Sequence, residues 1–404
     1  MTSQRLTQYL AIAALMAGCG FVLFNPLRLA FIANVFVPFL FFNLAVMLCC
    51  GLWFLSQWRK VEIRPVEFVI VFLVLVTAAL TPYEGRKIVD IMTDLLRPIL
   101  FVVTVVVIRN FVNIDAINKS HGVQRWFRIS MWVTLVVVPA CWFISKYMQP
   151  LYPAFSSIDS MFGLGWLLAI GNFFGQGLYF AVLIASGKRG VYLAAFFVLC
   201  VCYWNKRLTL RGWMLFFSGL AVGGAMFSLF MSEVQQLFFK GVQLTGLSGG
   251  GSETERPLAA VASTLGGGRI EELRGALAAL DSYFQLVFGA GLGFAYHAEG
   301  FEQAGGLHRN LHFTPASLVI YYGVPFSIAF FFYLATFFFA ALRITKRSPG
   351  LVSYTYAVYC LASMVFLLTE FSVFAYVNFA ISCGVVGATV RMKSDAASAP
   401  SVNQ

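Results

Sequence analysis

Eleven apolar blocks divide this chain and constrain its fold more than any other feature. A helix that crosses the hydrocarbon core of a bilayer needs about 20 mostly apolar residues. Only 11% of the residues are charged, against about 25% in a soluble domain. The sequence therefore predicts an all-α, polytopic membrane protein with about 11–12 transmembrane helices. The blocks cover residues 9–24, 30–56, 66–82, 97–112, 129–147, 161–187, 190–204, 213–232, 316–342, 351–369 and 371–390.

All eight cysteines lie inside these apolar blocks, and no CxxC or Cys/His ligand spacing appears. A free cysteine behaves as a small apolar residue. We therefore expect buried thiols, with neither a disulfide framework nor a bound metal.

Basic residues cluster in some of the connections between blocks. Cytoplasmic loops of membrane proteins carry an excess of Lys and Arg, so the net charge of +11 reflects membrane topology. No basic segment is interleaved with exposed aromatic residues, which excludes a nucleic-acid partner. The connections predicted to be cytoplasmic contain Arg59, Lys60 and Arg64; Arg109, Lys119, Arg125 and Arg128; Lys206, Arg207 and Arg211; Arg343, Lys346 and Arg347; and Arg391 and Lys393.

The segment 233–312 has the opposite character, with eight acids, five Lys/Arg and three of the four histidines. We expect it to face the external, periplasmic side. The predicted division is an N-terminal transmembrane bundle (1–232), this periplasmic segment with short helices (233–312), C-terminal transmembrane helices (313–393) and a cytoplasmic tail (394–404).

One block conflicts with this topology. Three blocks separate the connections 113–128 and 205–212, and an odd number of crossings cannot return the chain to one side. The block 161–187 is rich in glycine and carries Asn172 and Gln176. Its 27 residues would extend about 40 Å as a helix, too short for two full crossings. A re-entrant or broken helix would resolve the conflict, provided that protein or a wet cavity shields the break; otherwise one cytoplasmic assignment is wrong.

The external segment contains an amphipathic stretch. In RIEELRGALAALDSYF, five apolar residues recur at the spacing of one helix face: Ile270, Leu273, Leu277, Leu280 and Phe284. Its charged beginning predicts a helix on the membrane surface or over a cavity. The glycine-rich turn FGAGLGFAY follows, and then LHRNLHFTP.

Together these motifs resemble the superfamily of O-antigen ligases and O-antigen polymerases. Arg269 opens the surface helix, Gly291 and Gly293 form the turn, His312 leads into a span, and Gly323 stands eleven residues later. The family's Ser-Arg-Gly-like turn corresponds to residues 186–190, with an extra glycine and lysine. The resemblance covers the C-terminal two thirds of the chain. The family's His-Asn pair is missing, because Phe313 follows His312, so His308 remains an alternative.

The resemblance implies a membrane glycosyltransferase that uses an undecaprenyl-diphosphate-linked glycan as donor, without a cofactor. Guanidinium groups match phosphate oxygens in pairs, so Arg189 and Arg269 are the candidate diphosphate ligands. Lys188 would assist electrostatically, and Arg274 is an alternative to Arg269. A histidine can accept the proton of a sugar hydroxyl at neutral pH, which makes His312 the candidate catalytic base. Direct attack would invert the anomeric configuration.

The site residues leave several functions open. An O-antigen ligase would use lipid A–core oligosaccharide as acceptor, whereas an O-antigen or exopolysaccharide polymerase would use a second lipid-linked repeat. A third variant would transfer the glycan to protein. The single large external segment favours the ligase, in the bacterial inner membrane among membrane lipids, with its active site facing the periplasm. Glycine-broken spans also suit a lipid or solute transporter, but the two halves show no internal repeat.

Overall fold

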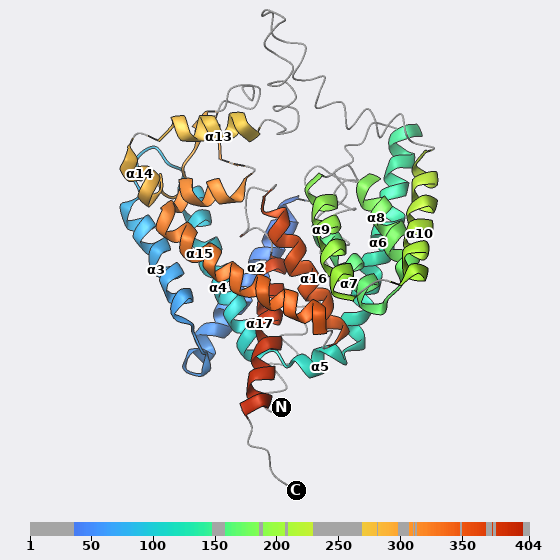
Figure 1. Cartoon of the computed structure of the whole chain (residues 1–404). Helices are drawn as coiled ribbons and strands as arrows, with labels where there is room; N and C mark the ends of the chain where they lie inside the picture. Colours follow the sequence, from blue (N-terminus) through green and yellow to red (C-terminus); the bar gives the residue numbers. More distant parts are fainter. Residues whose placement is uncertain are drawn as a thin grey trace, which may run out of the picture.

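The structure is a computed structural model, and its described part is almost entirely helical (Figure 1). The prediction of an all-α fold is confirmed. Two strands of two residues each, β1 (Tyr296–His297) and β2 (Leu307–His308), pair antiparallel. The predicted span 9–24 lies outside the described residues. Those are 36–147, 158–185, 189–206, 209–228, 269–280, 282–297, 307–309, 311, 313–347, 350–368, 374 and 377–398.

The helices form two groups with a shared centre (Figure 1). One group holds α2 (Phe36–Gln57), α3 (Pro65–Leu80), α4 (Ile88–Phe111) and α15 (Thr314–Arg347). The other holds α6 (His121–Tyr147), α7 (Met161–Ile170), α8 (Phe173–Ala185), α9 (Arg189–Lys206) and α10 (Leu210–Ser228). Between them lie α16 (Leu351–Phe366) and α17 (Val377–Ser398). The short α5 (Ile114–Asn118) joins the groups at one end, and α13 (Arg269–Ala278) and α14 (Tyr283–Phe288) lie at the other.

The centre of the fold is α16 with the first half of α17. Nearly every residue of α16 is buried, and so are residues 377–389 of α17. A helix that is apolar on all sides must be covered on all sides. These two helices therefore hold the bundle together, and the other helices present one side to them.

The glycine-rich block 161–187 is a helical hairpin. Gly171 takes a left-handed backbone conformation (φ +70°) and ends α7, and Asn172 caps α8 by accepting a hydrogen bond from the Gly175 N–H (2.9 Å). Across the hairpin the Tyr179 hydroxyl donates to the Ser160 carbonyl (2.7 Å) and the Gln176 side chain donates to the Leu167 carbonyl (2.9 Å). This pairing makes α7 and α8 antiparallel, so the predicted break in the block is confirmed.

Two of the described helices, α4 and α15, are long and apolar enough to cross a membrane. Shorter apolar segments of 10 to 17 residues lie within or overlap α3, α7, α8, α9, α10, α16 and α17. The two long helices support association with a membrane. The multi-pass arrangement and the four-part division of the chain remain predictions.

Two helices extend beyond the apolar blocks into neighbouring segments that contain charged residues. The helix α4 begins at Ile88 and not near residue 97, and its first turn contains Asp90, which favours a helix N-terminus. The helix α17 continues to Ser398, five residues into the predicted tail 394–404.

Candidate functional site

Four glycines shape the turn that follows α14. Gly289, Gly291 and Gly293 have φ values of +89°, +94° and +73°, and Gly323 has a φ of +85° inside α15. A side chain at Gly323 would place its Cβ 2.4 Å from the Val287 carbonyl oxygen. The Ala290 N–H donates to the Ile320 carbonyl (2.6 Å). Positive φ and close backbone approach both require glycine, so this turn and the kink of α15 fit together as one unit.

The loop before α4 holds the same turn from the other side. The Arg86 guanidinium donates to the carbonyl oxygens of Leu292 (2.7 Å) and Ala290 (2.8 Å), and the Thr81 hydroxyl accepts from the Leu292 N–H (3.0 Å). Burial lowers the pKa of Arg86 from its ordinary value, while Asp94 acts to raise it. An arginine stays charged in proteins, so Arg86 brings a fixed positive charge to the turn.

Arg309 anchors the histidine-bearing segment. It forms ion pairs with Asp90 and with Asp94 (2.7 Å to the latter), and Asp94 also accepts a hydrogen bond from the Gly293 N–H (2.8 Å). The Tyr321 hydroxyl donates to the Arg309 carbonyl, and the neighbouring Leu311 is buried. Arg309 is thereby fixed against α4 and α15, and it holds the described residues 307–309 at this end of the bundle.

A second arginine, Arg97 of α4, lies beside Asp94 at this end of the bundle. It is half-buried and lies within electrostatic reach of Asp94 and Arg309. Among the described residues, no hydrogen bond or ion pair reaches its guanidinium. Both carboxylates nearby already pair with Arg309. Arg97 can therefore bind an anionic group that enters from outside the protein.

The sequence prediction missed Asp90, Asp94 and Arg97. Their spacing of four and then three residues places them on one side of a helix. This spacing was the sequence feature that could have identified them as one cluster. The predicted span began at residue 97, so the first turns of α4 were assigned to a loop.

The predicted site residues lie at two separate places in the described backbone. Arg269 is the first residue of α13, which confirms that it opens this helix, and Arg189 is the first residue of α9. The Asn205 side chain donates to Thr345 (3.3 Å), which ties the C-terminal end of α9 to that of α15. The helix α9 extends about 24 Å from that contact to Arg189, so Arg189 lies toward the end at which α15 begins.

The remaining predicted residues are described only in part. His308 pairs with Tyr296 in the β-ladder, and the Arg274 side chain is exposed on α13. Lys188 and His312 lie outside the described residues, and so do the side chains of Arg189, Arg269 and His308. The convergence of these groups on one donor remains a prediction.

The predicted apolar face of residues 270–284 is confirmed only in part, because Leu273 and Leu280 pack partly buried against the core whereas Leu277 and Phe284 are exposed. The helix α13 ends at Ala278, and α14 begins only at Tyr283. On α13, Glu272 and Ala276 are buried, whereas Leu277 is 45% exposed. Glu272 lies close enough to Tyr296 of β1 to raise the pKa of that hydroxyl, together with burial. The helix thus places the Glu272 carboxylate near Tyr296 of β1, and it leaves Leu277 of the predicted apolar face exposed.

Replacing Gly323 with alanine should destabilise this end of the bundle by about 1–3 kcal/mol, because alanine does not tolerate the left-handed conformation there. The added Cβ would also meet the backbone of Phe288, 2.5 Å from its carbonyl carbon. Unfolding of the purified protein measures the loss. Gly224→Ala in α10 is the matched control, because a Cβ at that position meets nothing within 4 Å. Equal stability of the two variants would contradict the role of Gly323.

Comparison of the chain with protein families, with curated proteins and with solved structures found no match. The functional assignment therefore rests on the residues. At one end of the bundle they bring together a glycine turn, a histidine-bearing segment and an arginine able to take an anion.

Proposed function

We propose that this chain is a membrane glycosyltransferase of the O-antigen ligase type. It would transfer a glycan from undecaprenyl diphosphate to lipid A–core oligosaccharide, with inversion and without a metal ion. One observation carries the proposal. The glycine turn, residues 307–309 and the start of α15 all belong to the family-like stretch, and they pack together beside Arg97.

The reaction needs cations near the leaving group and a base near the acceptor. The acceptor hydroxyl oxygen attacks the anomeric carbon, and the bond from that carbon to the diphosphate oxygen breaks with its electron pair. Arg189 and Arg269 would neutralise the departing diphosphate, with Lys188 or Arg274 assisting. Arg97 adds a further cation in this proposal. His312, or alternatively His308, would take the hydroxyl proton.

The helical hairpin supports a multi-pass topology in the bacterial inner membrane. If α7 enters the bilayer and α8 leaves it on the same side, then the connections 113–128 and 205–212 share one side. The conflict in the predicted topology disappears, and the basic connections can all be cytoplasmic. Residues 269–311 then face the periplasm, where the lipid-linked donor and the acceptor would meet.

The hairpin also weakens the case for a transporter. Asn172 and Gln176 were the polar pair expected within a broken span. Asn172 caps α8, and the buried Gln176 bridges the Leu167 carbonyl and the Tyr203 hydroxyl (2.9 and 2.7 Å). Both side chains hold the hairpin together, which leaves less reason to assign them a transported substrate.

Purified protein, lipid-linked glycan and rough lipopolysaccharide, mixed in the presence of EDTA, provide the test of this function. Glycan transfer to lipopolysaccharide is the expected result. Lengthening of the lipid-linked glycan would instead identify a polymerase. Absence of both products, with an intact protein, would overturn the proposal and return attention to a transporter.

Arg189→Ala should raise the donor concentration needed for half-maximal transfer by about tenfold or more, because one charge-assisted contact to the diphosphate is lost. Titration of the lipid-linked donor at a fixed acceptor concentration measures this change. Arg211→Ala is the matched control, because Arg211 is exposed and lies at the start of α10. If donor saturation were unchanged in Arg189→Ala, this arginine would not bind the donor.

A further inference from the structure

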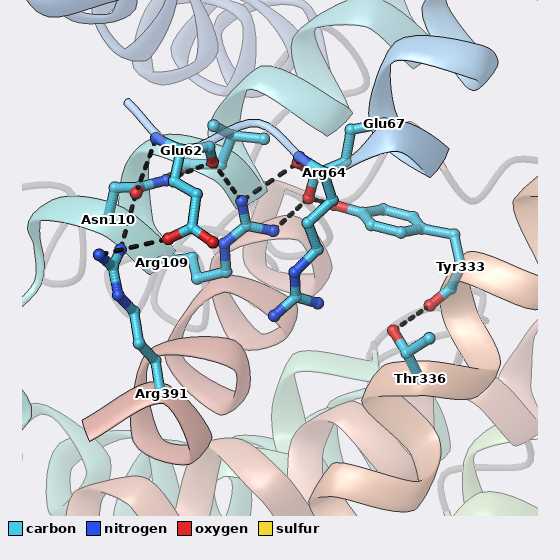
Figure 2. Close-up of polar contacts among 9 residues, drawn as sticks. Glu62, Arg64, Glu67, Arg109, Asn110, Tyr333, Thr336 and Arg391 are labelled. Carbon is cyan, nitrogen blue, oxygen red and sulfur yellow. Dashed lines mark hydrogen bonds and ion pairs between the residues drawn. The ribbon is translucent and has the colours of Figure 1, made fainter. Parts of the chain in front are cut away.

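A second charged cluster lies at the opposite end of α4 and α15 from the glycine turn (Figure 2). Its centre is the ion pair between Arg109 of α4 and Glu67 of α3, with side chains only 2% and 0% exposed. The Tyr333 hydroxyl of α15 donates to the same carboxylate (3.0 Å), and so does the backbone N–H of Arg64 (2.8 Å). Both oxygens of the Glu67 carboxylate therefore already accept hydrogen bonds within the protein.

The only other acid in this cluster, as described, is also paired. Glu62 lies 3.3 Å from Arg391 of α17, and Arg391 donates as well to Asn110 (2.8 Å). Two acids thus neutralise two arginines, Arg109 and Arg391. Arg64 is left without a hydrogen bond or ion pair to its guanidinium among the described residues. Figure 2 shows this side chain extending away from the Glu67 carboxylate.

Arg64 lines a pocket of about 300 Å³ between α3, α15 and α17, and Arg343 is a second cation on its wall. Arg343 has no ion-pair partner in the described part of the chain. The rest of the lining is mainly apolar: Thr336, Phe337, Phe339, Ala340, Gly387 and Val390. Phe339 is 58% exposed, so the apolar wall continues onto the outer surface of the bundle.

The charge at this end of the molecule matches that of a cytoplasmic membrane interface. Lys346 and Arg347 lie in the last turn of α15, and Arg59 and Lys60 follow α2. Basic pockets between membrane helices on this side bind the head groups of anionic lipids. A phosphodiester would satisfy both arginines of the pocket, and an acyl chain would cover the adjoining apolar wall.

We propose that this pocket binds an anionic phospholipid of the cytoplasmic leaflet. Arg64 and Arg343 hold its phosphate, and its acyl chain lies along Phe339. The site is separate from the proposed transfer site and does not depend on that function. The bound lipid would join α3, α15 and α17 at the end where Glu67 and Arg109 already connect them.

The test uses the full-length protein in nanodiscs or detergent with phosphatidylglycerol or phosphatidylcholine as the probe. Native mass spectrometry measures the lipid retained. We expect Arg64→Gln with Arg343→Gln to lower the affinity for phosphatidylglycerol about tenfold or more, since two charge-assisted contacts are lost. The matched control is Lys60→Gln with Lys346→Gln, which removes two exposed cations at the same end but outside the pocket lining.

Three outcomes would overturn the proposal: no loss in the arginine variant, an equal loss in the lysine variant, or displacement of phosphatidylglycerol by millimolar inorganic phosphate. The last would identify a site for free phosphate. A second variant, Ala340→Phe, fills the pocket and keeps both arginines, so it should also release the lipid. It provides the same test if the arginine variant does not fold, and retention of the lipid by Ala340→Phe would likewise contradict the proposed position.

Discussion

Replacing His312 with alanine should lower the rate of glycan transfer by about 10²–10⁴-fold, the usual contribution of a positioned general base. A sugar hydroxyl is a weak nucleophile until its proton is removed. The donor should still bind, because the proposed diphosphate ligands are arginines, so the loss should appear in kcat and not in donor saturation. Single-turnover transfer with preloaded donor measures the chemical step.

His308→Ala is the matched variant, because it removes a histidine from the same segment. We expect it to retain most of the activity. The reverse result, full activity in His312→Ala and loss in His308→Ala, would move the base to His308. Full activity in both variants would remove histidine from the mechanism. Because an ordinary histidine has a pKa near 6.5, wild-type transfer should fall as the pH drops below about 6.5, and the active variant should keep that profile.

The parts of the site that could be predicted from sequence are those in which the local backbone favours one particular residue type. Gly291 and Gly293 were predicted to form a turn, and their positive φ values (+94° and +73°) favour glycine at both positions. The kink at Gly323 was not predicted, because residues 316–342 form one continuous apolar block. The break at Gly171 followed from the length of its block, which is too short for two crossings.

Other parts depended on partners distant in sequence. Glu272 is buried on α13 while Leu277 is exposed, because the packing of α13 against β1 overrides the apolar periodicity. The place of Asp94 in the site depends on its contacts with Gly293 and Arg309, which lie about 200 residues later in the chain. The local sequence around α4 carries no sign of either contact.

The same reason explains why the charge of Arg64 could not be interpreted from sequence. Arg64, Arg109, Arg343 and Arg391 all counted as cytoplasmic topology signals. The structure separates them, because Arg109 and Arg391 have carboxylate partners, whereas the described part of the chain provides no ion-pair partner for Arg64 or Arg343. Only the assembled helices show which cations remain available for a ligand.

Replacing Glu67 with alanine should destabilise the protein by about 3–5 kcal/mol, which is the usual cost of removing one partner of a buried ion pair. Arg109 would remain buried with no carboxylate, and the Tyr333 hydroxyl would lose its acceptor. The Arg109 guanidinium would keep only its contact with the Glu62 carbonyl (2.6 Å). Reversible SDS-induced unfolding of the purified protein in mixed micelles measures the change.

The informative control removes the whole network and not one member of it. In a triple variant, Glu67→Met, Arg109→Met and Tyr333→Phe, no charge or hydroxyl of the network stays buried without a partner. Well-packed apolar residues often replace a buried ion pair with little loss of stability, so this variant should unfold closer to the wild type than Glu67→Ala does. A triple variant as unstable as Glu67→Ala would show that the ion pair itself, and not the uncompensated charge, accounts for the loss.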